Sequence, residues 1–175
     1  AGQPTAARVG IVTSLFGDKV SAPALAVLTE AVATRWSSDA DLVDAVERLG
    51  AQAAFAAAQD DGSLDRVEDE LFTFSRAVDD SAELQMALTN PALTPENKAA
   101  VVRDLTSATA APATVAVLAH AAGNLRGRRP AAAIEELARL ASEQRQQVLA
   151  EVRSAIELTP EQRTRLASAL SALQG

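Results

Sequence analysis

Cysteine and tyrosine are absent from the 175-residue sequence, and histidine occurs once. The missing cysteines exclude disulfides, thiolate metal sites and a cysteine nucleophile. A single histidine, His120, rules out a multi-histidine metal site and the H-E-x-x-H motif within this sequence. The glycine-rich phosphate motifs G-x-x-x-x-G-K-[ST] and G-x-G-x-x-G are also missing. We therefore expect no cofactor, no metal and no catalytic activity.

The sequence has no excess of positive charge and no long apolar run. Its 16 Lys and Arg residues are outnumbered by 23 Asp and Glu residues, which gives a formal charge of −7. Binding to a phosphate backbone needs a basic surface, so we expect no nucleic-acid partner. No stretch approaches the roughly 18 consecutive apolar residues of a membrane span. We expect no direct membrane insertion from this segment.

Aromatic residues make up only 3% of the sequence, and alanine dominates the apolar fraction. Alanine is the best helix former because it loses no side-chain entropy in a helix. Proline, serine, threonine and glycine recur at the positions where helices start and stop. These signals predict helices at about 5–16, 22–35, 39–60, 63–80 and 81–88, further helices from 95, 112 and 160, and one over 130–144.

The periodicity changes near residue 148. Apolar and charged residues alternate from Val148 to Leu158, which is typical of a half-buried strand. Thr159 to Gln162 then form a capping box that opens a last helix. A lone strand is unstable without partners, so we expect 147–175 to be the start of a small α/β domain and the sequence to be an excerpt of a longer protein.

An internal repeat links the two halves of the helical region. At an offset of 90 positions, 8–15 align with 98–105 and 22–28 align with 112–118. With one gap, the repeat also pairs three apolar positions, Val43 with Ile134, Val46 with Leu137 and Leu49 with Leu140. A chance similarity between alanine-rich helices is the alternative. The predicted division is extra helices in 1–40 that form a partial copy, a six-helix bundle in 41–146, and the incomplete domain in 147–175.

The remaining polar clusters offer little chemistry. Acid–base catalysis needs two carboxylates in different, partly buried environments, whereas Glu68 to Glu70 and Glu135–Glu136 are expected on solvated helix faces. A catalytic triad would have to use His120, which lies within a helix and has no nucleophile motif nearby. Three arginines in 126–129 are expected in a solvated loop or against an acidic partner. Trp36 is expected to be a core or hinge anchor.

Several of these motifs occur together in a known family. The segments 70–74 and 84–91, with Lys98 and Leu105, are similar to the "L..L.NP......K...L" pattern of the delta (OSCP-type) subunit of F-type ATP synthases. Residues 152–162 resemble the V-x-S-A…L-(S/T)…Q opening of that family's C-terminal domain. The extra N-terminal residues and the composition resemble the actinobacterial form, which in mycobacteria is fused behind the b subunit.

The resemblance implies a fold, a function and a site. It implies a mainly α protein with an OSCP-like helical bundle that serves as a peripheral-stalk (stator) subunit on the cytoplasmic side of the plasma membrane. It also implies partners, namely the N-terminal helices of alpha subunits and a b-type stalk subunit. The alpha-binding groove would lie between 41–59 and 112–124, with these candidates: Leu42, Ala45, Leu49, Ala53, Val115, Leu118 and Ala122. The alternatives are a small cytosolic helical enzyme, a ligand-binding protein or a generic helical scaffold.

Overall fold

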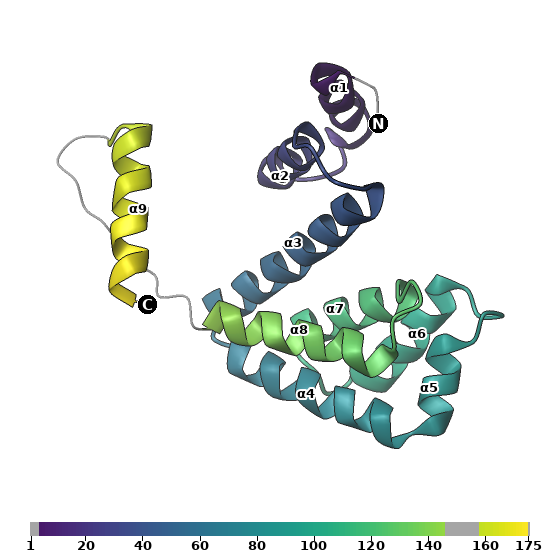
Figure 1. Ribbon diagram of the computed structural model, residues 1–175. Helices are drawn as coiled ribbons and strands as arrows, with labels where there is room; N and C mark the ends of the chain where they lie inside the picture. The colour runs from purple at the N-terminus through teal and green to yellow at the C-terminus, as the bar shows by residue number, and fades with distance from the viewer. Residues whose placement is uncertain (1–3, 146–157, 175) are drawn as a thin grey trace. The chain divides into compact units, whose positions relative to one another are not determined.

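The computed structural model describes residues 4–145 and 158–174, and in these residues it is helical without strands (Figure 1). The mainly α prediction is confirmed for this part of the chain. Residues 1–145 and 146–175 form two compact units. The helices of the first unit are α1 (Thr5–Phe16), α2 (Ala22–Ala33), α3 (Asp39–Asp60), α4 (Leu64–Asp80), α5 (Ala82–Thr89), α6 (Pro95–Thr106), α7 (Pro112–Gly123) and α8 (Pro130–Arg145), and the second unit holds α9 (Pro160–Gln174).

Local capping explains most helix starts. The Ser38 hydroxyl accepts a hydrogen bond from the Asp41 N–H, and the Asp41 carboxylate accepts one from the Ser38 N–H, so α3 begins with a full capping box. Thr159 and Gln162 exchange the same pair of bonds at α9, as predicted. Ser63 precedes α4 as expected, but its side chain makes no capping bond. Instead, the Ser63 N–H donates to the Asp61 carboxylate in the preceding turn.

The core of the first unit lies among α3 to α8. Helices α4 and α8 run side by side along it (Figure 1). Phe55 of α3, Leu71 of α4 and Leu88 of α5 are at most 1% exposed and are among the largest side chains buried there. Alanines fill much of the remaining space, including Ala58 and Ala141, so the helices approach one another closely.

Helices α1 and α2 form a hairpin that contacts α3 through α2. Arg8 of α1 donates to the carbonyl oxygen of Ala33, which ties the first helix to the end of the second. The Trp36 indole N–H donates to the Ala31 carbonyl at 2.6 Å, and the ring is partly buried. Trp36 therefore fixes the turn between α2 and α3, in line with the anchor that we expected.

The end of α2 differs from the sequence prediction, and the predicted strand lies almost wholly outside the described residues. Helix α2 ends at Ala33, not near Arg35, because Thr34 adopts an extended backbone conformation. The predicted strand at 148–158 falls, apart from Leu158, outside the described residues. The division into 1–40, 41–146 and 147–175 stays a prediction.

Candidate functional site: an apolar groove

A groove of about 610 Å³ opens between α3, α7 and α8. Each helix contributes small or aliphatic side chains to its wall. Helix α3 contributes Val46, Gly50, Ala51 and Ala54; α7 contributes Ala116, Val117 and Ala121; and α8 contributes Ala133, Leu137 and Leu140. The groove is thus mainly apolar, and its small residues allow a ligand backbone to approach closely.

Gly50 is the most unusual of these wall residues. Glycine within a helix costs about 1 kcal/mol relative to alanine because it loses more conformational freedom on folding. A Cβ atom built on Gly50 would meet nothing within 4 Å, so packing inside the chain does not require glycine here. The missing side chain instead widens the groove in the middle of its α3 wall.

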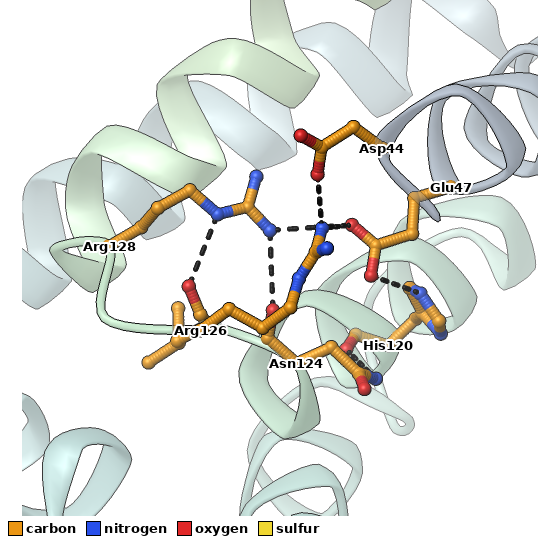
Figure 2. A network of polar contacts seen from close by, with 7 residues as sticks. Asp44, Glu47, His120, Asn124, Arg126 and Arg128 are labelled. Carbon is orange, nitrogen blue, oxygen red and sulfur yellow. Dashed lines mark hydrogen bonds and ion pairs between the residues drawn. The ribbon is translucent and has the colours of Figure 1, made fainter. Parts of the chain in front are cut away.

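Asp44, Glu47, His120 and Arg128 line the groove and belong to a network of polar contacts (Figure 2). Glu47 of α3 is the centre of this network. Its carboxylate accepts hydrogen bonds from the Arg126 and Arg128 guanidinium groups, and its Oε1 lies 3.7 Å from Nε2 of His120. Arg126 also donates to Asp44. The loop between α7 and α8 is therefore held against α3 by ion pairs between residues about 80 positions apart.

The backbone of this loop is itself unusual. Arg126 has a φ of 47° and Gly127 has a φ of 81°, so two consecutive residues adopt left-handed conformations. Such a conformation costs a non-glycine residue roughly 1 kcal/mol. It turns Arg126 toward Asp44 and Glu47, and the ion pairs offset the cost (Figure 2). The three arginines lie in an exposed loop, as one of the two expectations had it, and Arg126 and Arg128 pair with acidic residues of the same chain; an acidic partner stays a prediction.

The seven residues predicted from the sequence do not line this groove. Leu118 and Ala122 of α7 are only 2% and 5% exposed and pack in the core, which corrects their assignment to a binding surface. Val115 is partly buried. On α3, Leu42 and Ala45 are partly buried while Leu49 and Ala53 are exposed, yet none of the four faces the cavity.

The correction has a simple physical reason. Helix α7 is apolar on nearly all sides, so its sequence does not show which face is buried. Val117 and Ala121 line the groove, although Val117 also belongs to the core cluster, whereas Leu118 and Ala122 belong to the core without lining the groove. The groove thus lies between the two predicted helices and α8, and other faces of α3 and α7 line it than the predicted ones.

Sequence reasoning also missed the role of Glu70. We expected this carboxylate on a solvated face, but it accepts hydrogen bonds from the Ala111 N–H at 2.9 Å and the Thr114 hydroxyl at 2.6 Å. Burial alone would raise the pKa of Glu70. The hydrogen bonds from Thr114 and Ala111, together with the hydrogen bond and positive charge of Arg66, outweigh burial, so the pKa of Glu70 lies below its usual value. Glu70 of α4 thus caps α7, whose own N-cap residue is alanine.

Other kinds of site find no support in the described part of the chain. In residues 4–145 and 158–174, no group of three or more His, Asp or Glu side chains could hold a metal ion. None of the helices described is both long and apolar enough to cross a membrane. His120 lies in the last turn of α7, and its Nε2 is 3.7 Å from Oε1 of Glu47.

Comparison with known proteins places the chain in a family. Residues 46–175 match the ATP synthase delta (OSCP) subunit family. The chain is 40% identical over 172 residues to ATP synthase subunit delta of Nocardia farcinica, covering 98% of this chain and 64% of the relative. It is 39% identical to ATP synthase subunit delta of Acidothermus cellulolyticus, and the match covers 96% of this chain and 61% of the relative. It is 38% identical to ATP synthase subunit delta of Streptomyces griseus, and the match covers 96% of this chain and 62% of the relative.

The chain thus spans less than two thirds of the length of these relatives. The family match nevertheless covers most of the sequence, including all of α4 to α8 and the greater part of α3. The resemblance inferred from short motifs is confirmed by these matches: the chain belongs to the ATP synthase delta (OSCP) subunit family.

Proposed function

We propose that this chain is part of a peripheral-stalk (stator) subunit of a proton-translocating ATP synthase. In this role the protein links the catalytic head to a b-type stalk subunit and resists the torque of the rotor. Membership of the family and the name shared by its relatives, ATP synthase subunit delta, support the proposal. The protein would act without catalysis of its own, as a peripheral protein on the cytoplasmic side of the plasma membrane. The b-type partner is either a separate subunit or part of the same polypeptide.

The groove between α3, α7 and α8 is the proposed docking site for an N-terminal helix of an alpha subunit. The observation that carries this assignment is the apolar, small-residue lining of a groove with a volume of about 610 Å³. Amphipathic helices bind in such grooves by burying one apolar face. The charged groups that line the groove pair with charges within the chain, whereas an enzyme pocket would direct several polar groups at a substrate.

A substitution at Gly50 tests the docking site without disturbing the core. Gly50→Leu places a branched side chain in the open space of the groove, where an added Cβ meets no neighbour within 4 Å. We expect the affinity for a synthetic alpha-subunit N-terminal peptide to fall at least about tenfold, because the docked helix and the new side chain would occupy the same volume. Isothermal titration calorimetry measures the change.

Gly10→Leu is the matched control. Gly10 also lies within a helix and has open space around its Cβ position, but it belongs to α1 and lies outside the groove. Circular dichroism establishes that both variants are folded. If folded Gly50→Leu binds the peptide as tightly as Gly10→Leu, the groove is not the docking site.

A further inference from the structure

The three N-terminal helices expose large apolar side chains. Phe16 of α1, Val27 of α2, and Val43 and Leu49 of α3 are between 39% and 45% exposed. The whole of α1 has no buried residue, and α2 buries only Ala31. Single exposed apolar residues are common, but several on consecutive helices that contact one another indicate a surface that packs against something.

The structure gives this surface a counterpart within the same chain. Adding 90 to the bounds of α1, 5–16, gives 95–106, which are the bounds of α6. Adding 90 to those of α2, 22–33, gives 112–123, the bounds of α7. Helix α3 begins at residue 39 and α8 at residue 130, which are 91 positions apart. The sequence repeat therefore coincides with a repeat of helices, and α1 and α2 form a hairpin as α6 and α7 do.

The two copies differ in what covers them. At the offset of 91, Val43 corresponds to Ile134 and Leu49 to Leu140, which are 4% and 3% exposed. At the offset of 90, Val27 corresponds to Val117, which is 6% exposed. Each of these three buried positions is thus matched by an exposed apolar residue in the first copy. Leu15 of α1 is also exposed, but its counterpart in the second copy, Leu105, is not buried and is 58% exposed.

Helix α4 is the main cover of α8 in the second copy. These two helices have the most extensive contact in the first unit, and α4 also contacts α7. Its covering stripe consists of Val67, Leu71 and Val78, all at 0% exposure. Because this stripe is already buried, the α4 of a second copy of the chain is not available to cover α3.

We propose that α1, α2 and the first half of α3 belong to a second bundle of the same kind, completed by an amphipathic helix that precedes residue 1 in the same polypeptide. This helix would have the apolar spacing of α4 and would cover Val43 and Leu49. The chain order of the repeat supports the choice of occupant, since α4 precedes α6 and α7 in the complete copy. The relatives, of which this chain covers 61% to 64%, are long enough to hold such a segment.

Cross-linking in the full-length protein identifies the occupant. The 175 residues contain no cysteine, so Val43→Cys adds one thiol to this region that can carry a maleimide-linked photo-cross-linker. We expect illumination to join residue 43 to a helix N-terminal to residue 1 of the same polypeptide, as mapped by mass spectrometry. Cross-links to another subunit or to a second copy would overturn the proposal, as would a full-length chain without a helix ahead of Thr5.

Matched aspartate substitutions provide an independent measurement in the same full-length protein. Val43→Asp should lower the melting temperature by about 5 °C or more, because it places a charge in the proposed interface. Leu15→Asp should change it by about 1 °C or less, because its counterpart stays exposed in the complete bundle. Equal effects of the two substitutions would overturn the proposal. If Val43→Asp does not fold, the cross-linking experiment alone tests whether an N-terminal helix covers residue 43.

Discussion

Replacing Glu70 with glutamine should destabilise the bundle by removing a charge that caps a helix from outside. The carboxylate of Glu70 accepts hydrogen bonds from the Ala111 N–H, the Thr114 hydroxyl and, at 2.7 Å, the Arg66 guanidinium. Helix α7 has no side-chain cap and no acidic residue in its first turn. Glu70 therefore provides both the hydrogen-bond acceptor and the negative charge that a helix N-terminus favours.

The contacts set the size of the effect. The bond from Arg66 contributes little, because 58% of the Arg66 side chain is exposed and water screens the pair. The bonds from Ala111 and Thr114 are less exposed, and a hydrogen bond to a charged group contributes roughly 1.5–3 kcal/mol. A glutamine oxygen still accepts both bonds but without the charge, so Glu70→Gln should cost about 1–2 kcal/mol. Glu70→Ala should cost about 3 kcal/mol, since Thr114, at 1% exposure, would lose its partner.

The effect should depend on pH in a defined direction. The folded-state pKa of Glu70 lies below its usual value of 4.5. A depressed pKa adds stability above the unfolded-state value, and this stability is lost as the pH falls through the folded-state value. The difference between wild type and Glu70→Gln should therefore be full at pH 7, begin to shrink below about pH 4.5, and be smallest at pH 3.

Urea unfolding followed by circular dichroism at 222 nm measures these differences. Asp69→Asn is the matched control, because Asp69 neighbours Glu70 on α4 but is exposed, and it should change the free energy of unfolding by about 0.5 kcal/mol or less. A Glu70→Gln variant as stable as Asp69→Asn at pH 7 would refute the capping role. A stability difference that stays constant down to pH 3 would refute the proposed charge contribution.

Two further predictions concern glycines and the single tryptophan. Gly50→Ala should raise the free energy of unfolding by about 0.5–1 kcal/mol, whereas Gly123→Ala should lower it by about 1 kcal/mol because its Cβ would lie 3.0 Å from the Pro95 carbonyl oxygen. Urea unfolding of both variants measures these changes. A change of the same sign in the free energy of unfolding of both variants would contradict the difference in packing at the two glycines. In the 175-residue chain, Trp36 fluorescence should change at a lower urea concentration than circular dichroism, since α1 and α2 bury only Ala31. Coincident transitions would show one cooperative unit.

Local signals made the helices predictable. Ser38, Thr94, Pro112 and Pro130 mark helix starts through capping and fixed backbone angles, which depend only on nearby residues. The bounds of α1 and α3 follow the sequence prediction closely for this reason. The family resemblance likewise depended on short motifs that can be read along the chain, and it was confirmed by the comparisons.

The faces of the helices were not predictable in the same way. Val117 and Leu118 are adjacent and equally apolar, so only tertiary packing decides which one borders the groove. The contact between Glu70 and Thr114 joins residues 44 positions apart, and no local pattern indicates it. The ion pairs of Glu47 are equally remote in sequence. Sequence reasoning therefore indicated α3 and α7 but neither α8 nor the residues that line the groove, and the role of the groove as a docking site stays a proposal.

The paired charges that line the groove would affect the rate of the docking that we propose. Asp44, Glu47 and Arg128 are each engaged with a charge of opposite sign within the chain, as are Arg48 and Glu136. Paired charges of this kind produce little field beyond the surface, so they do not attract a charged helix from a distance. These pairs would then add little steering to the field of the chain's net charge of −7, and the choice among competing helices would depend on shape and on how long each one stays bound.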